Sequence, residues 1–301
     1  MLRVAALQLK ASTQRQDVHR RVAGLVEEAA KRGAKLAVLP ESFTGIYGAD
    51  HFEANGEVWK NKDSGTKLIS NLAKEHGIVV VGGVIEMHPI NKKLYSTIAA
   101  FDPRGLEVAR YRKMHLSTVP GTLGNKMTEA STLTPGEELA WFDIADGGTP
   151  DSDGRGWRVG IACGFDLRFP EIAGLYANTP PMGLGSELLL YPSASTNIAG
   201  WDSLLKARAL DSQCFVMGVH AAHDDNEGNN SMMIGPAGET LSESSDCTSD
   251  CCIVADLSLR SLIDVRQKAP LKEARRSHVY GDALRNVHSN PMAMMRKGPN
   301  V

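Results

Sequence analysis

Short apolar runs alternate with amphipathic helical patterns along almost the whole chain, and this alternation constrains the fold more than any other feature. Residues 2–9 and 78–85 are apolar runs of strand length, whereas residues 17–32 and 64–76 repeat apolar positions on one helical face. The alternation continues through both halves of the sequence without an evident linker. It therefore predicts one α/β domain whose strands are buried on both faces.

Composition and charge exclude some classes of function. The chain has 301 residues, is 42% hydrophobic and 23% charged, and carries a formal net charge of −2. It has no basic field for nucleic acid or an anionic membrane, and no apolar run approaches the roughly 18–20 residues of a membrane span. No signal-peptide pattern follows Met1, and five cysteines, an odd number, predict reduced thiols and a cytoplasmic location.

Three reactive side chains stand where predicted strands end. Glu41 follows the apolar run 34–39, Lys113 follows the run 106–111, and Cys163 follows a short apolar strand. Taken singly, each has an ordinary structural explanation: a loop acid, a surface lysine whose stem covers apolar groups, and a buried packing cysteine. Ligand groups in open α/β sheets gather at the carboxyl ends of strands, however, so the three side chains together predict one site.

An acid, an ammonium and a thiol are the groups that cleave an amide or a nitrile by a covalent route. Glu41 would take the proton of the Cys163 thiol, the thiolate would attack the carbon, and Lys113 would hold the negative charge that develops. Ammonia would leave a thioester, and water activated by the same glutamate would release the acid. Because other nucleophiles can also resolve a thioester, acyl transfer and a related dehydratase chemistry stay open.

Several segments, in order along the chain, resemble the nitrilase superfamily, the carbon–nitrogen hydrolases. Residues 39–41, 112–116 and 166–171 are similar to the three signature segments of that family. Glu129 with residues 133–136 is similar to its second glutamate and the turn that follows. Further similarities lie at residues 191–194, 206–211 and 235–239.

The resemblance covers nearly the whole chain and implies a carbon–nitrogen hydrolase domain at 1–276. It leaves a C-terminal tail at 277–301, partly flexible or at a subunit interface. It implies a four-layer αββα sandwich, a homodimer or larger homo-oligomer, and a site without a metal or cofactor. The omega-amidase-like branch is the most similar, which implies hydrolysis of a small-molecule amide, an omega-amide of a dicarboxylate. The resemblance also places Glu129, Gly164 and Phe165 at the site as supporting or substrate-binding residues.

One departure from the family pattern bears on the mechanism. The family places its cysteine two residues before the aspartate; counting back from Asp166, that position is Gly164, and Cys163 stands one residue early. Because a one-residue shift turns a strand side chain to the opposite face, two hypotheses remain. Either a local bulge re-aims Cys163 into the pocket, or the nucleophile is missing. In the second case the protein is a catalytically impaired or inactive homologue that binds a small molecule or serves as an assembly subunit. Departures at Gly200 and Asn229 further predict a remodelled substrate pocket.

Overall fold

The computed structural model describes residues 1–118, 128–145, 156–178, 183–194, 198–223 and 229–282. Within them, twelve strands form one sheet in the order β5-β4-β3-β2-β1-β9-β8-β7-β6, with β12 beside β1, β10 beside β9, and β11 beside β10. The strands are β1 (Leu2–Lys10), β2 (Leu36–Val38), β3 (Val79–Met87), β4 (Leu94–Phe101), β5 (Glu107–Arg112), β6 (Ala140–Ile144), β7 (Trp157–Ile161), β8 (Leu188–Ser193), β9 (Phe215–Ala222), β10 (Met232–Ile234), β11 (Thr240–Glu243) and β12 (Cys251–Leu257).

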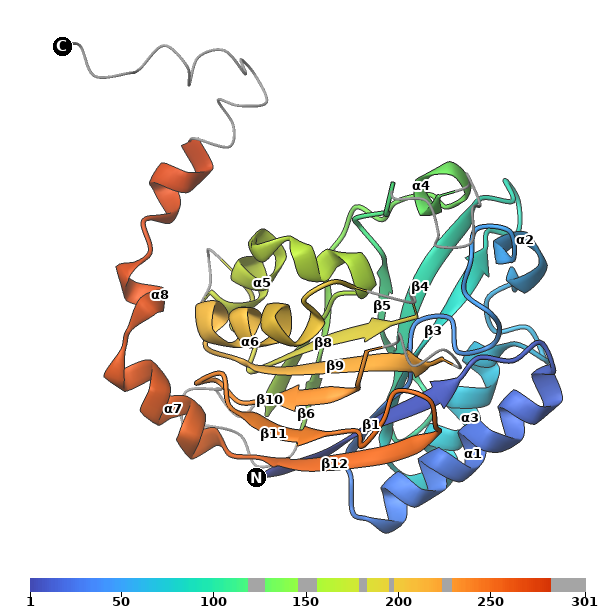
Figure 1. Cartoon of the computed structure of the whole chain (residues 1–301), viewed down its shortest axis with the longest axis horizontal. Helices are drawn as coiled ribbons and strands as arrows, with labels where there is room; N and C mark the ends of the chain where they lie inside the picture. The colour runs from blue at the N-terminus through green and yellow to red at the C-terminus, as the bar shows by residue number, and fades with distance from the viewer. Residues whose placement is uncertain (119–127, 146–155, 179–182, 195–197, 224–228, 283–301) are drawn as a thin grey trace.

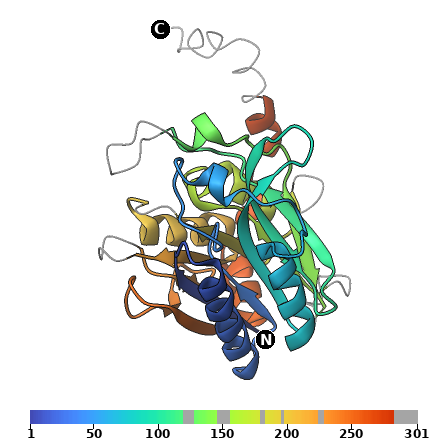
Figure 2. The same ribbon diagram turned by 90° about the vertical axis from the view of Figure 1, so that its right-hand side faces the viewer.

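The helices are α1 (Arg15–Lys31), α2 (Phe52–Asn55), α3 (Gly65–His76), α4 (Glu129–Thr132), α5 (Pro170–Ala177), α6 (Trp201–Ser212), α7 (Leu259–Lys268) and α8 (Leu271–Ala274), with a 3₁₀ helix, η2, at Gly164–Arg168. Four of them, α1, α3, α5 and α6, cover the outer faces of the sheet. Helices α1 and α3 lie side by side over the half of the sheet that contains β1 to β4, as Figure 2 shows. Helices α5 and α6 pack over the half that contains β7 to β9 (Figure 1).

The sheet folds back on itself where β1 meets β9. These two strands pair only at Leu9–Lys10 and Ala221–Ala222, so the two halves diverge and face each other. The apolar cluster between the halves takes side chains from both, among them Tyr111 and Trp157, and both of these are fully buried. The layers therefore run helix, sheet, sheet, helix, which confirms the αββα sandwich.

Strand direction determines where the strands deliver their side chains. β2 is parallel to β1 and β3. β4 is antiparallel to both β3 and β5, so β5 runs in the same direction as β3 and β2. β7, β8 and β9 are parallel to one another, and β9 is parallel to β1. The carboxyl ends of β2, β5 and β7 thus lie at the same end of the sandwich, where α/β folds build their sites.

Local sequence signals explain several element ends. The Ser64 hydroxyl accepts from the backbone N–H of Lys67 and caps α3, and Gly77, with φ of 64°, ends that helix in the left-handed conformation. The predicted strands and helices are found with ends shifted by a few residues. Strands β6 and β11 and the short helices α2, α4 and α8 were not predicted, because they are short and weakly periodic.

The C-terminal part of the chain contains the last strand and the start of the predicted tail. Cys251 and Cys252 begin β12, and Cys252 is buried. Of the tail expected at 277–301, residues 277–282 are helical and the rest lie outside the described residues. No helix in the described part of the chain is long and apolar enough to cross a membrane.

Candidate active site

The ends of β2 and β5 bring Glu41 and Lys113 into direct contact. Both side chains are buried, and Lys113 Nζ lies 3.2 Å from Glu41 Oε1. Gly83 on the neighbouring strand permits the close approach of the Glu41 backbone, since a Cβ there would lie 2.8 Å from Glu41 Cα. Beside it, Ser42 has a positive φ of 50°, a strained conformation for a residue with a side chain. The backbone that carries the acid is therefore tightly constrained.

Glu129, at the start of α4, completes a three-residue ion cluster. Its carboxylate oxygens lie 3.0 and 2.9 Å from Lys113 Nζ, and it also accepts from the backbone N–H of Ser117 at 2.9 Å. The turn predicted at residues 133–136 braces the lysine, because the Gly136 N–H donates to the Lys113 carbonyl at 2.8 Å. The structure thus brings the predicted second glutamate against the predicted cation.

The contacts within this cluster keep Lys113 and Glu129 in their charged forms. Burial disfavours the ammonium of Lys113, but Glu129 and Glu41 outweigh it and raise the pKa of Lys113 above its ordinary value. Burial likewise disfavours a Glu129 carboxylate, yet Lys113 and the Ser117 N–H lower the pKa of Glu129. The lysine is therefore a charged donor and Glu129 its charged partner throughout the neutral pH range.

Two hydroxyl groups that the sequence did not single out hold the acid in place. Ser96 Oγ donates to Glu41 Oε1 at 2.6 Å. The Tyr47 hydroxyl lies 2.9 Å from Glu41 Oε1, 2.9 Å from Glu129 Oε1 and 3.2 Å from Lys113 Nζ. Burial, followed by the charges of Glu129 and Glu41, raises the pKa of Tyr47 far above its usual value, so it stays a neutral donor. The run of hydroxyl residues Tyr95, Ser96 and Thr97 in the otherwise apolar β4 was the available signal for Ser96, whereas Tyr47 lies in a loop without one.

The residue that faces the acid and the ammonium is Gly164. A Cβ built on it would lie 2.8 Å from Glu41 Oε2 and 3.1 Å from Lys113 Nζ, and its φ of 49° is left-handed. Glu41 Oε2 is buried and has no partner of normal hydrogen-bond geometry among the described residues. The free oxygen of the acid therefore points to the position where the family pattern places its cysteine.

Cys163, one residue before Gly164, is packed beside the same acid. It is fully buried and belongs to the apolar cluster between the two halves of the sheet, with Val159 and Ile161 of the same strand face. Its backbone is extended, and β7 pairs with β6 and β8 without a register shift as far as Ile161. The bulge considered from the sequence would lie beyond that pairing, at Gly164, and it stays a prediction. Burial, and next the nearby Glu41 charge with a weak hydrogen bond to it, raise the pKa of the Cys163 thiol well above its ordinary value.

Asp166 holds the turn between β7 and η2. Its buried carboxylate accepts from the Cys163 N–H at 2.9 Å, from the Tyr111 hydroxyl at 2.6 Å and from the His115 N–H at 2.9 Å. Because these bonds join the turn to the segment after β5, they fix Gly164 relative to the end of that strand. Phe165, the other predicted site residue of this turn, is partly exposed and packs edge-to-face on Phe169.

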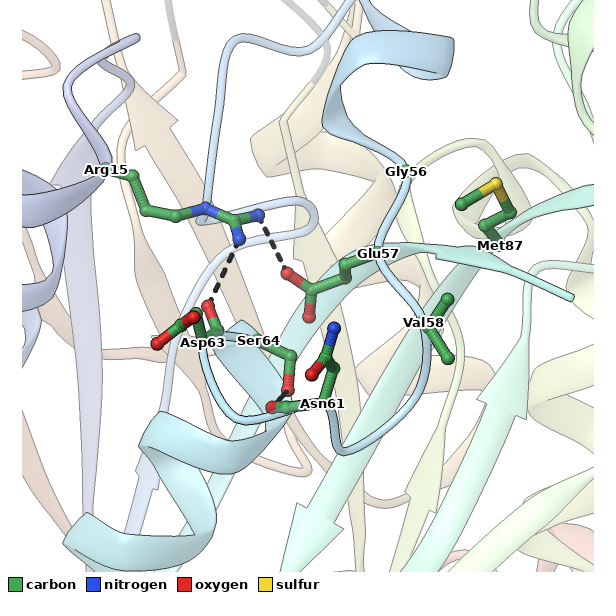
Figure 3. Close-up of a pocket in the computed structure, with 8 residues that line it drawn as sticks. All are labelled: Arg15, Gly56, Glu57, Val58, Asn61, Asp63, Ser64 and Met87. Atoms are coloured by element: carbon green, nitrogen blue, oxygen red, sulfur yellow. Dashed lines mark hydrogen bonds and ion pairs between the residues drawn. The ribbon is translucent and has the colours of Figure 1, made fainter. Parts of the chain in front are cut away.

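A separate cavity of about 200 Å³ lies beside the start of α1 and the loop before α3 (Figure 3). Glu57 and Arg15 point toward each other across it, with Arg15 Nη2 donating at 3.0 Å, and the Gly65 N–H donates to the same carboxylate at 3.1 Å. Burial raises the pKa of Glu57. The strand-end residues do not line this cavity, and its ion pair joins the start of α1 to the segment between α2 and α3. Among the described residues, no group of three His, Cys, Asp or Glu side chains is placed to hold a metal ion.

Comparison with known proteins gives a family and a set of relatives. Residues 3–267 match the carbon-nitrogen hydrolase family. The omega-amidase NIT2 of Homo sapiens is 35% identical over 287 residues, which cover 92% of this chain and 96% of that protein. The omega-amidase NIT2 of Danio rerio is 36% identical with the same coverage, 92% and 96%.

Solved structures share the fold. Nit3 of Saccharomyces cerevisiae, a member of branch 10 of the nitrilase superfamily, superposes with a TM-score of 0.77 at 29% identity, covering 91% of this chain and 96% of that one. A variant amidase from Nesterenkonia sp. AN1, with an acetamide moiety added covalently at its active-site cysteine, has a TM-score of 0.75 at 21% identity and covers 93% and 96%. The family match along the chain and the shared αββα fold show that this protein belongs to the carbon–nitrogen hydrolase family of the nitrilase superfamily.

Proposed function

We propose that this protein hydrolyses the carbon–nitrogen bond of a small amide over Gly164 and releases ammonia. One observation carries the proposal. Glu41 Oε2, buried and without a partner of normal hydrogen-bond geometry among the described residues, and Lys113 Nζ converge on the same point, 2.8 and 3.1 Å from a Cβ at residue 164. A base and a fixed ammonium around one point are what acyl transfer from an amide requires.

Each charged residue has a separate role. Glu41 accepts a proton from the attacking nucleophile and returns it to the departing nitrogen. Lys113 exchanges its long contact to Tyr47, 3.2 Å, for the oxyanion that forms on the amide carbonyl. Glu129 keeps Lys113 charged and oriented through its contacts of 3.0 and 2.9 Å. Two nucleophiles are open to this chemistry: the Cys163 thiol, as predicted from the sequence, and water.

The substrate class follows from the relatives named above as omega-amidases. An omega-amide of a dicarboxylate is the favoured substrate, and the predicted homodimer or larger homo-oligomer and the predicted cytoplasmic location are part of the same proposal. Light scattering of the purified chain tests the oligomeric state.

The test is ammonia release from a panel of amides. Mono-amides of four- and five-carbon dicarboxylates should be cleaved faster than amides of the same length that lack the carboxylate. Glu41→Gln preserves the shape of the side chain but removes the base, and it should lower the rate by about a hundredfold or more. Ammonia release equal in wild type and Glu41→Gln would contradict the assignment.

A second candidate function is non-hydrolytic binding of the same amides, or service as an assembly subunit. The observation in its favour is that Gly164, which has no nucleophile, occupies the position facing Glu41 and Lys113. Calorimetric titration separates the two functions. Heat of binding from an omega-amide, with no ammonia formed by the wild type over the same period, would favour the binder.

A further inference from the structure

We propose that Ser96 is a positioning residue of this site: its hydroxyl group fixes which oxygen of Glu41 serves as the base, and its backbone carbonyl group holds Lys113 beside that acid. The inference rests on the proposed amide hydrolysis. It adds a residue that acts through the base and the ammonium rather than on the substrate.

Ser96 forms hydrogen bonds with both of these charged residues. Its Oγ donates to Glu41 Oε1 at 2.6 Å, and its carbonyl oxygen accepts from the Lys113 backbone N–H at 2.9 Å. The side chain is 1% exposed, and β4 pairs with β3 along its whole length. Ser96 therefore holds the base and the ammonium together from a strand that has little freedom to move.

The two oxygens of Glu41 have different surroundings. Oε1 accepts from Ser96, Tyr47 and Lys113 at 2.6, 2.9 and 3.2 Å. Oε2 lies 2.8 Å from the position of a Cβ on Gly164, beside the turn after β7. Because the last torsion of a glutamate side chain has a broad minimum, its donors decide which oxygen faces that turn.

Of the three donors, Ser96 is the one committed to Glu41. Lys113 Nζ also contacts Glu129 at 3.0 Å, and the Tyr47 hydroxyl lies 2.9 Å from either glutamate. Among the described residues, the Ser96 hydroxyl has its hydrogen bond to Glu41 alone, and this contact is the shortest of the three. Loss of this hydroxyl should therefore free the carboxylate to rotate more than loss of another donor would.

Thr97, the next residue of β4, offers a matched comparison. It is also fully buried, and its Oγ1 donates at 2.8 Å to another buried carboxylate, that of Glu86. Successive strand residues face opposite sides of a sheet, and Glu86 pairs with Arg112 and Arg110. Loss of either hydroxyl removes one hydrogen bond to a buried glutamate, but only the loss at Ser96 affects the base.

The groups that face Glu41 keep their charge between about pH 5 and pH 8. Burial raises the pKa values of the Tyr47 hydroxyl and the Cys163 thiol above 10.0 and 9.0. Against the effect of burial, Glu129 raises the pKa of Lys113 above 10.5, and Lys113 lowers the pKa of Glu129 below 4.5. A hydrogen bond donated to a carboxylate favours its charged form, so loss of the Ser96 donor should move the acid limb of the rate to higher pH.

The experiment measures ammonia release by wild type, Ser96→Ala and Thr97→Val between about pH 5 and pH 8, with a mono-amide of a dicarboxylate as probe. Ser96→Ala should lower kcat about tenfold or more and leave KM within about twofold, because the base is misdirected while the contacts to the substrate remain. Its acid limb should move up by roughly half to one pH unit. Thr97→Val should lose a similar amount of thermal stability but keep the kcat and the acid limb of the wild type.

Two additions separate a positioning role from a structural one. Circular dichroism at the assay temperature gives the folded fraction by which each rate is divided. Ser96→Cys keeps the size of the side chain but donates weakly, so its kcat and acid limb should lie between those of Ser96→Ala and wild type.

Equal losses of kcat in Ser96→Ala and Thr97→Val, with an acid limb that does not move, would overturn the positioning role and leave the amide hydrolysis standing. A Ser96→Cys rate below that of Ser96→Ala would overturn it as well. No ammonia from wild type would instead overturn the proposed hydrolysis itself.

Discussion

Tyr47→Phe removes the hydroxyl group that joins the three charged residues of the site. That hydroxyl lies 2.9 Å from both Glu41 Oε1 and Glu129 Oε1, and 3.2 Å from Lys113 Nζ. It has one proton, so it donates to one carboxylate at a time while it accepts from the ammonium. Hydrogen bonds to charged groups stabilise by roughly 1.5–3 kcal/mol, and the remaining contacts of the cluster repair part of the loss. We expect Tyr47→Phe to destabilise the fold by about 2 kcal/mol.

The chain offers a matched control, Tyr191→Phe, for which the expected change in stability has the opposite sign. Tyr191 is also fully buried, but its hydroxyl has no hydrogen-bond partner among the described residues. Tyr191→Phe therefore removes an unpaired buried group, which costs roughly 1–3 kcal/mol to bury, and should leave the melting temperature unchanged or raise it. Both variants delete one oxygen from a buried tyrosine, so packing volume and residue type are held constant.

Thermal unfolding and ammonia release measure the two consequences. At about 2–4 °C per kcal/mol for a chain somewhat smaller than this one, Tyr47→Phe should melt about 4 °C below wild type. Its rate of ammonia release should fall about tenfold or more, because Glu41 loses one of the contacts that orient its free oxygen. A melting temperature within 1 °C of wild type, or shifts of equal sign and size in the two tyrosine variants, would refute the view that this hydroxyl organises the site.

Two further perturbations test the surroundings of the acid and its charge. Gly83→Ala places a methyl group 2.8 Å from Glu41 Cα, so it should lower the free energy of unfolding by about 1–3 kcal/mol and displace the base. The control Gly24→Ala, in open space within α1, should be neutral or stabilising. Equal midpoints of urea unfolding for the two variants would contradict the steric argument. The pKa of Glu129 is lowered from 4.5 in the folded chain, so its contribution to stability is present above pH 4.5 and is lost as the pH falls through the lower folded value. The pKa of Lys113 is raised, so its contribution is complete below pH 10.5 and does not change on the acid side. The melting temperature of wild type should therefore fall more steeply between pH 5 and pH 3 than that of Glu129→Gln, and parallel curves would count against the ion cluster.

The sequence determined the framework of this protein and three members of its site. Periodicity indicated the α/β alternation, and strands that run in one direction deliver their following residues to one end of a sheet. Glu41 and Lys113 could be paired on that ground alone, and the resemblance to the carbon–nitrogen hydrolases added Glu129. Spacing from Asp166 also placed Gly164, rather than Cys163, in the register of the family's cysteine.

Only the tertiary structure decided how these residues meet. Tyr47 reaches both carboxylates from a loop, and Ser96 reaches Glu41 from another strand, across contacts that no local pattern encodes. The direction of a strand-end side chain depends on backbone angles that the sequence leaves open when a glycine follows. The fold placed Cys163 in the apolar cluster between the sheets and turned Gly164 toward the acid and the ammonium. Cys163 is extended and Gly164, with φ of 49°, begins η2, so the turn between β7 and that helix decides how both residues lie beside the acid.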